Sequence, residues 1–105
     1  MDRTEYLKLL DKNESVLVVF ITATWCGPCN KIKAYVEKKL ECIPFLLIDV
    51  DKDSNVYSSL RSKKQIRGVP TLLAYTKGSI IPSATMSGTN EKEINAFFDN
   101  LDFLQ

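Results

Sequence analysis

An unbroken apolar run at positions 16–21 constrains the fold more than any other feature of the chain. The run is rich in β-branched residues and too short for a helix of its own, which is typical of a strand buried on both faces of a sheet. A second such run follows at 45–50, and between the two, residues 30–41 carry apolar side chains at helical spacing. A strand, a helix and a strand within about 35 residues predict a βαβ unit with a right-handed crossover.

Helical and strand patterns alternate along the rest of the chain. The expected order is α-β-α-β-α-β-β-α, which predicts an α/β fold with a central mixed sheet covered by helices. Pro82 predicts a bulge or an extended turn near the last strand. Helices are expected at 3–12, 54–64 and 94–101, the last capped by Asn90 with Glu93, and strands at 71–75 and 80–86 around a turn at Lys77-Gly78.

The composition is that of one ordinary globular domain. The chain has 105 residues, a formal net charge of +1 and 45% hydrophobic residues, so we expect a single domain over residues 1–105. The near-zero charge argues against nucleic acid as a partner. No apolar run approaches the roughly 18 residues of a membrane span, and the charged start of the chain does not resemble a secretory signal. A cytoplasmic protein is therefore expected.

The chain has no histidine and three cysteines. The missing histidine excludes Ser-His-Asp and Cys-His catalysis and leaves proton transfer to carboxylates, thiols or water. Cys26 and Cys29 flank Gly27-Pro28, between the first expected strand and the next helix. Unpaired N–H groups at a helix start stabilise a thiolate, so we predict a lowered pKa for Cys26. Cys26 would then be the nucleophile in thiol–disulfide exchange, and Cys29, one turn inside the helix, would resolve the mixed disulfide.

Other interpretations of the cysteines are weaker. Two cysteines at this spacing often form half of a zinc site, but one spare cysteine and no histidine leave few further ligands, so no metal is expected. Two structural cysteines could share the spacing by chance, although they would not need Trp25, Gly27 and Pro28 around them. Cys42 is expected to be a small apolar residue beneath the helix end, with a regulatory or dimerising disulfide as the alternative.

Three segments resemble the thioredoxin family, in the same order along the chain. Residues 23–29 (ATWCGPC) match its active-site segment, 66–71 (IRGVPT) its loop ending in a cis-proline, and 88–93 (GTNEKE) its glycine loop and last-helix start. With the element order, the resemblance covers nearly the whole chain. It implies a thioredoxin-like fold and a thiol–disulfide oxidoreductase that reduces protein disulfides through a Cys26–Cys29 dithiol/disulfide cycle, without a bound cofactor.

The resemblance also implies a substrate surface and a redox partner. The Val69–Pro70 bond would be cis and would lie beside the cysteines, where its backbone pairs with an extended substrate segment; taken alone, the sequence equally allows a trans proline that starts a strand. A flavoprotein thioredoxin reductase using NADPH, or a glutathione-based system, would reduce the disulfide again. The residues expected to form the flat apolar surface around Cys26 are Trp25, Gly27, Pro28, Val69, Pro70 and Gly88.

The chain departs from that family inside the expected core. Thioredoxins carry a buried aspartate six positions before the first active-site cysteine, where this chain has Phe20, and the neighbouring lysine position falls on Leu47. Losing an isolated buried carboxylate is expected to stabilise the fold. It also removes an internal base, so we expect Cys29 to resolve mixed disulfides slowly near neutral pH, with water as the proton carrier.

The chain also departs from the family at one edge of the sheet. No residues are available for the family's first strand, which leaves the strand at 45–50 as an exposed edge, partly protected by Pro44 and Asp49. We expect a monomer, with pairing of this edge to another chain as the alternative. The four strands are expected in the spatial order 45–50, 16–21, 71–75, 80–86.

Two other functions compete with disulfide reduction. One is a binding module that holds a partner protein and exchanges disulfides only incidentally. Phe20 is compatible with this function, because it weakens the case for optimised turnover. The other is a more oxidising, isomerase-like protein, against which the Gly27-Pro28 dipeptide argues.

Overall fold

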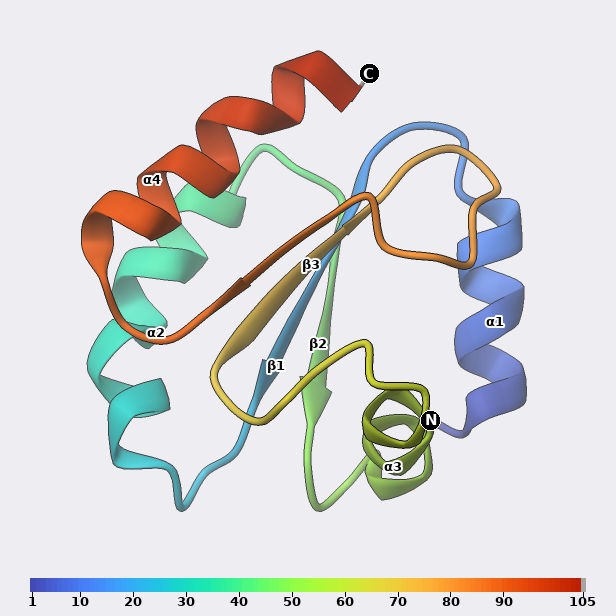
Figure 1. Ribbon diagram of the computed structural model, residues 1–105, viewed down its shortest axis with the longest axis horizontal. Helices are drawn as coiled ribbons and strands as arrows, with labels where there is room; N and C mark the ends of the chain where they lie inside the picture. The colour runs from blue at the N-terminus through green and yellow to red at the C-terminus, as the bar shows by residue number, and fades with distance from the viewer. Residues whose placement is uncertain (105) are drawn as a thin grey trace.

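The computed structural model describes residues 1–104 (Figure 1). Helices and strands follow one another in the predicted order, and a short 3₁₀ helix ends the described part of the chain. The elements are α1 (Arg3–Lys12), β1 (Leu17–Thr22), α2 (Gly27–Leu40), β2 (Phe45–Asp49), α3 (Ser54–Ser62), β3 (Thr71–Tyr75), β4 (Ala84–Ser87), α4 (Glu91–Asp99) and the 3₁₀ helix η1 (Asn100–Leu104).

The four strands form one mixed sheet in the order β2-β1-β3-β4. β1 and β2 run parallel, as the predicted βαβ unit requires, whereas β1–β3 and β3–β4 are antiparallel. Figure 1 shows α2 and α4 on one side of the sheet and α1 and α3 on the other. The predicted mixed sheet of four strands, its helical layers and its strand order are therefore confirmed.

Each face of the sheet has its own core, because successive side chains of β1 point to opposite faces. Val18 and Phe20 pack with residues of α2 and α4, whereas Val19 and Ile21 pack with residues of α1 and α3. Every residue of β1 is buried, as expected for a strand in the middle of a sheet. This strand is the rigid base from which the following loop, with the first cysteine, begins.

Side chains cap the helices at both ends of the chain. The Asp2 carboxylate accepts the N–H of Glu5 at 2.9 Å, and the Asn90 side chain accepts the N–H of Glu93 at 3.1 Å. Each bond satisfies a donor that the first turn of a helix leaves free. The predicted cap at Asn90 is therefore confirmed.

Several predicted boundaries were wrong, including both ends of the last helix, predicted at 94–101 and found at Glu91–Asp99. The helix predicted at 30–41 begins earlier, at Gly27, because Pro28 suits the first helical turn, where a missing N–H costs nothing. The strand predicted at 80–86 is shortened to β4, since Pro82 has no N–H for a ladder and the residues before Ser83 form an extended turn. In this turn Gly78 has a φ of +65° and donates its N–H to the carbonyl of Asn13.

The outer edge of β2 is open within the described residues. Phe45 and Leu47 point to the α2 side of the sheet and remain 46% and 47% exposed, because α2 covers β1 rather than β2. On the opposite face Ile48 is fully buried. Among residues 1–104, no helix has the length and apolar character needed to cross a membrane.

Candidate functional site

The first cysteine lies where β1 ends and α2 begins. Cys26 is the N-cap of α2, and its Sγ accepts the N–H of Cys29 at 3.1 Å while its carbonyl accepts the N–H of Asn30 at 3.1 Å. The sulfur thus occupies the position of a capping oxygen, close to the free N–H groups and the positive end of the helix dipole. In the reduced protein these donors stabilise a thiolate at Cys26.

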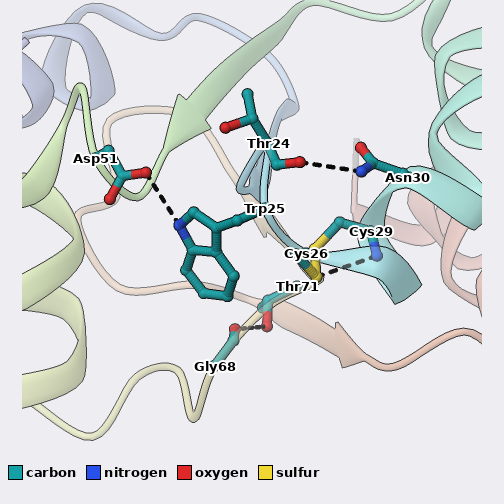
Figure 2. Close-up of a disulfide and its surroundings, with 8 residues drawn as sticks. All are labelled: Thr24, Trp25, Cys26, Cys29, Asn30, Asp51, Gly68 and Thr71. Carbon is teal, nitrogen blue, oxygen red and sulfur yellow. Dashed lines mark hydrogen bonds between the residues drawn. A yellow bond between two sulfur atoms is a disulfide. The ribbon is translucent and has the colours of Figure 1, made fainter.

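Cys26 and Cys29 form a disulfide, shown in Figure 2, with their Cα atoms 5.2 Å apart. The two sulfurs differ in access: Cys29 is completely buried, whereas Cys26 retains 6% exposure beside the exposed Gly27 and Pro28. Apart from its chain neighbours and the backbone of α2, no atom lies within 4 Å of the position that a Cβ on Gly27 would take, so no other segment covers this position beside the first cysteine. Cys26 is therefore the cysteine of the pair that lies nearer to solvent.

The loop before β3 packs directly against the cysteine pair. Val69 and Val50 contact the cluster of Ala23, Cys26 and Cys29. The Val69–Pro70 peptide bond is cis, as the resemblance implied. Val69 comes forty residues after Cys29 in the sequence. The antiparallel pairing of β3 with β1 brings its loop beside the disulfide.

Polar contacts hold this loop in place. The hydroxyl of Thr71 donates to the carbonyl of Gly68 at 2.7 Å, and the N–H of Gly88 donates to the carbonyl of Pro70 at 3.1 Å. Gly88 has a φ of +102°, a conformation that residues with a Cβ rarely adopt. Val69 and Gly88 are partly exposed, whereas Pro70 is buried and so borders the surface mainly through its backbone.

Two hydrogen bonds at the site were not predicted. Trp25 is exposed, and its indole N–H donates to the Asp51 carboxylate at 3.0 Å (Figure 2). The amide of Asn30 donates to the carbonyl of Thr24 at 3.1 Å, which ties the loop to the first turn of α2. No sequence signal pairs Asp51 with Trp25, because the contact arises only from the parallel pairing of β1 with β2.

The core beneath the cysteines contains no carboxylate. Phe20 is fully buried, and its register partner on β2 is Leu47. These two positions align with the buried aspartate and the lysine of the family, and they are neighbours in this protein. Among the described residues no buried side chain carries a charge, and the buried hydroxyls are those of Thr22, Thr71, Tyr6 and Tyr75. Residues 1–104 also contain no group of three histidine, cysteine or carboxylate side chains that could hold a metal ion.

A family model described as Thioredoxin matches residues 1–100. The chain belongs to the thioredoxin family. With its redox-active Cys26–Cys29 pair, this thioredoxin-family protein is a thiol–disulfide oxidoreductase. The predictions of fold and reaction class drawn from the three sequence motifs are therefore confirmed.

Individual relatives agree with this assignment. The chain is 31% identical to Thioredoxin 1 of Plasmodium falciparum, over 92% of this chain and 89% of the relative. It is 30% identical to human thioredoxin, over 94% of this chain and 92% of the relative. A solved structure of Plasmodium falciparum thioredoxin superposes with a TM-score of 0.75 at 26% identity, over 94% of this chain and 93% of that one.

The third cysteine is not where it was expected. Cys42 is free and exposed just after α2, not buried beneath the helix end, because the chain leaves the helix at Leu40 and turns outward before Pro44. A helix of this length places it about 20 Å along the axis from the active-site pair. Its thiol therefore lies outside the redox site of this thioredoxin-family protein.

The aspartates after β2 form a local hydrogen-bond network. The Asp49 carboxylate accepts the N–H groups of Asp51 and Lys52, and Asp53 accepts the N–H of Asp49 at 3.0 Å and the N-terminal ammonium at 2.9 Å. Burial raises the pKa of the Asp53 carboxyl, but the Asp49 N–H and the ammonium of Met1 outweigh it and hold that pKa below its usual value. The network fixes the chain between β2 and α3.

Proposed function

We propose that this protein reduces disulfides in other proteins, with Cys26 as the attacking and Cys29 as the resolving residue. The observation that supports these roles is the difference in access between the two sulfurs, since only Cys26 reaches the surface. The Cys26 thiolate attacks a substrate disulfide and forms a mixed disulfide, and one substrate sulfur leaves as a thiolate. Cys29 then loses its proton and attacks Cys26, which releases the second substrate sulfur and leaves two electrons on the substrate.

The substrate is an extended protein segment that docks across the cis-proline loop. Trp25 and Pro28 offer exposed apolar surface, and the partly exposed backbone at Val69 offers hydrogen bonds to an added strand. Gly27 leaves room above the disulfide, while Pro70 and Gly88 set the shape of the loop. A flavoprotein reductase using NADPH, or a glutathione-based system, returns the disulfide to the dithiol.

Reduction of insulin by dithiothreitol, with and without the protein, tests this proposal. The wild-type protein is expected to accelerate the reaction at least about tenfold. Cys26→Ser should lose all of that acceleration, because Cys29 is buried and Cys42 has no second thiol beside it to resolve a mixed disulfide. Cys29→Ser should trap a mixed disulfide that is visible in the mass of the intact protein. Cys42→Ser is the matched control and should behave as the wild type.

A wild-type protein no faster than free dithiothreitol would favour a binding module instead. In that case the protein holds its partner through the same surface, and pull-down of that partner would not depend on either active-site thiol. A reduction potential close to that of glutathione or more oxidising would favour an isomerase-like function.

Resolution by Cys29 is slow near neutral pH, because Phe20 and the apolar residues around the disulfide provide no base. A Phe20→Asp variant should release a chromogenic thiol from Cys26 about tenfold faster near pH 7, and Phe20→Asn, of similar shape and no charge, should not. The comparison is made where circular dichroism shows all three proteins folded. An equal rate in both variants would contradict this part of the proposal.

A cytoplasmic location, with a role in cell redox homeostasis, fits this activity best. A reductant needs a compartment that keeps its dithiol reduced. Fractionation of the cells that produce the protein, with alkylation of free thiols at lysis, tests the location and the redox state together.

A further inference from the structure

The charges of the chain are unevenly distributed along the sequence. All 13 acidic residues lie within 1–53 and 91–105, so residues 54–90 contain none. Five basic residues give this acid-free segment a charge of +5, whereas the rest of the chain, with nine basic and 13 acidic residues, carries −4. The segment includes α3, β3, β4 and the cis-proline loop between α3 and β3. The small net charge therefore combines a positive segment, which contributes to the proposed substrate surface, with a negative remainder.

Four of these five basic residues lie between the last turn of α3 and the cis-proline loop. They are Arg61, Lys63, Lys64 and Arg67, and all four are exposed. Within residues 1–104 none of them forms an ion pair with a carboxylate, whereas Lys33 on α2 lies 4.0 Å from Glu37. The Arg61 guanidinium lies over the ring of Tyr57 instead, 6.0 Å from its centroid. The four positive charges are therefore available to a partner.

Lys64 occupies a backbone position that glycine normally fills. α3 ends in a Schellman motif, in which the N–H of Lys64 donates to the carbonyl of Arg61 and the N–H of Gln65 to that of Leu60, both at 3.0 Å. Lys64 has a φ of +60°, a left-handed conformation that a Cβ disfavours, and among residues 1–104 no other residue except glycine has a positive φ. The negative end of the helix dipole favours cations such as Arg61 in the last turn, but it does not require a lysine at this position. The needs of the helix end therefore do not explain Lys64.

Arg67 lies outside the helix and close to the cis-proline loop. It precedes Val69 by two residues, so their Cα atoms are at most about 7.6 Å apart. Ile66 beside it is buried in the core that includes α3, which holds the start of the loop in place. An extended substrate segment advances about 3.3 Å per residue, so from Val69 it passes Arg67 within about three residues and reaches Lys64 within about six.

We propose that the substrates of this protein carry acidic residues within about six positions of the attacked cysteine, on the side that faces Lys64 and Arg67. This inference rests on the proposed reduction of protein disulfides and specifies its substrate class. Cations beside a docking surface speed the encounter with an acidic partner and orient it. Asp51, which accepts the indole N–H of Trp25, places a negative charge at another part of the site and opposes an acidic segment there. The basic side chains thus select the substrate, while the exchange itself takes place between sulfurs.

Three peptides test the proposal with the reduced full chain. Each has one cysteine in a disulfide with a chromogenic thiol, whose release is followed by absorbance. One peptide has glutamates among the residues before the cysteine, one has them after it, and the third has glutamines at all of these positions. One glutamate peptide should react about tenfold faster than the glutamine peptide at about 20 mM ionic strength, and this gain should fall to about twofold at about 0.5 M salt. The other glutamate peptide should show no such gain, because strand pairing fixes the direction of the segment.

Charge-removing variants locate the effect on the molecule. Lys64→Gln/Arg67→Gln should reduce the gain to about twofold, because the favoured glutamate peptide loses its partners. Lys38→Gln/Lys39→Gln removes the same number of charges from the last turn of α2 and is the matched control, which should keep the gain. Lys64→Gly should lower the gain and at the same time raise the urea midpoint of unfolding, since glycine suits the left-handed position.

Three results would overturn the proposal: equal rates for all peptides at low ionic strength, an equal gain for both glutamate peptides, or a loss of the gain in Lys38→Gln/Lys39→Gln. A basic segment that binds an oligonucleotide but gives no gain with either glutamate peptide would overturn it equally. If the protein reduces neither the peptides nor insulin faster than free dithiothreitol does, the proposed function itself fails.

Discussion

The two faces of the sheet treat their buried polar groups differently. On the face covered by α1 and α3, the hydroxyls of Tyr6 and Tyr75 bond to each other at 2.7 Å, and Thr71 bonds to Gly68. On the face covered by α2 and α4, Phe20 stands in an apolar core and the hydroxyl of Thr22 is buried with no partner among the described residues. On this face, which carries the redox helix, the Tyr35 hydroxyl donates to the Asn95 side chain between α2 and α4, so Thr22 has the buried hydroxyl that is left without a partner.

The buried hydroxyl pair that stabilises the fold therefore lies away from the residues that carry the redox chemistry. The paired hydroxyls lie in the cluster that contains α1 and α3, away from the cysteines. Burial raises the pKa of Tyr6 well above its usual value and that of Tyr75 to about 12, so both stay neutral under all ordinary conditions. Beneath the disulfide, in contrast, the packed side chains are apolar and include no carboxylate.

The largest expected effect comes from putting a charge on the apolar face. Phe20→Asp should lower the free energy of unfolding by about 3–5 kcal/mol at pH 7, because a fully buried carboxylate would have no partner. The pKa of that carboxyl would be raised in the folded protein, so the variant should regain stability as the pH falls below 7. Urea unfolding at several pH values measures both effects.

Phe20→Leu is the control for lost packing and should cost only about 1 kcal/mol, with no new pH dependence. A small, pH-independent loss in Phe20→Asp would mean that water or a charged group reaches this face. The contrast between the two faces would then not hold in solution.

The helices and strands could be predicted because their causes are local. The apolar run of β1, the Pro28 helix start and the Asn90 cap are each determined by neighbours in sequence. The site followed from Cys26 and Cys29 for the same reason, since a helix start by itself creates the environment of the thiolate.

What the sequence could not reveal depends on contacts between distant segments. Trp25 meets Asp51 only because β1 and β2 are parallel neighbours. The position of Val69 beside the disulfide also depends on a distant contact, the pairing of β3 with β1, and only the family resemblance predicted it. Cys42 was expected to be buried, but the direction in which the chain leaves α2 decides its exposure, and no periodicity encodes that direction. The unpaired hydroxyl of Thr22 is equally invisible in the sequence.

The tyrosine pair should show strong coupling on the other face. Tyr75→Phe or Tyr6→Phe alone should cost about 1–3 kcal/mol, because each leaves a buried hydroxyl without its partner. The double variant should cost clearly less than the sum, since neither hydroxyl is then left unpaired. A double-mutant cycle in urea measures this coupling, and strict additivity would show that the pair is not a unit.

Alkaline pH tests the same pair without a substitution. Tyrosines in the unfolded chain ionise near pH 10, whereas the folded protein keeps both hydroxyls protonated, with the pKa of Tyr75 at about 12. The unfolded state therefore binds fewer protons in this window, and the free energy of unfolding should fall between about pH 10 and 12. In the Tyr6→Phe/Tyr75→Phe variant this loss should be smaller, and an identical loss would show that the pair is not its source.

The smallest expected effect has the opposite sign. Thr22→Val removes a buried hydroxyl without a partner and keeps the shape of the side chain, so it should raise the free energy of unfolding by about 1 kcal/mol. Thr71→Val makes the same change on the other face, where the hydroxyl donates to Gly68 and lies 3.1 Å from that of Ser87, and it should lower stability by about as much. If both substitutions destabilise the protein equally, Thr22 has a partner in solution and the two faces do not differ in this respect.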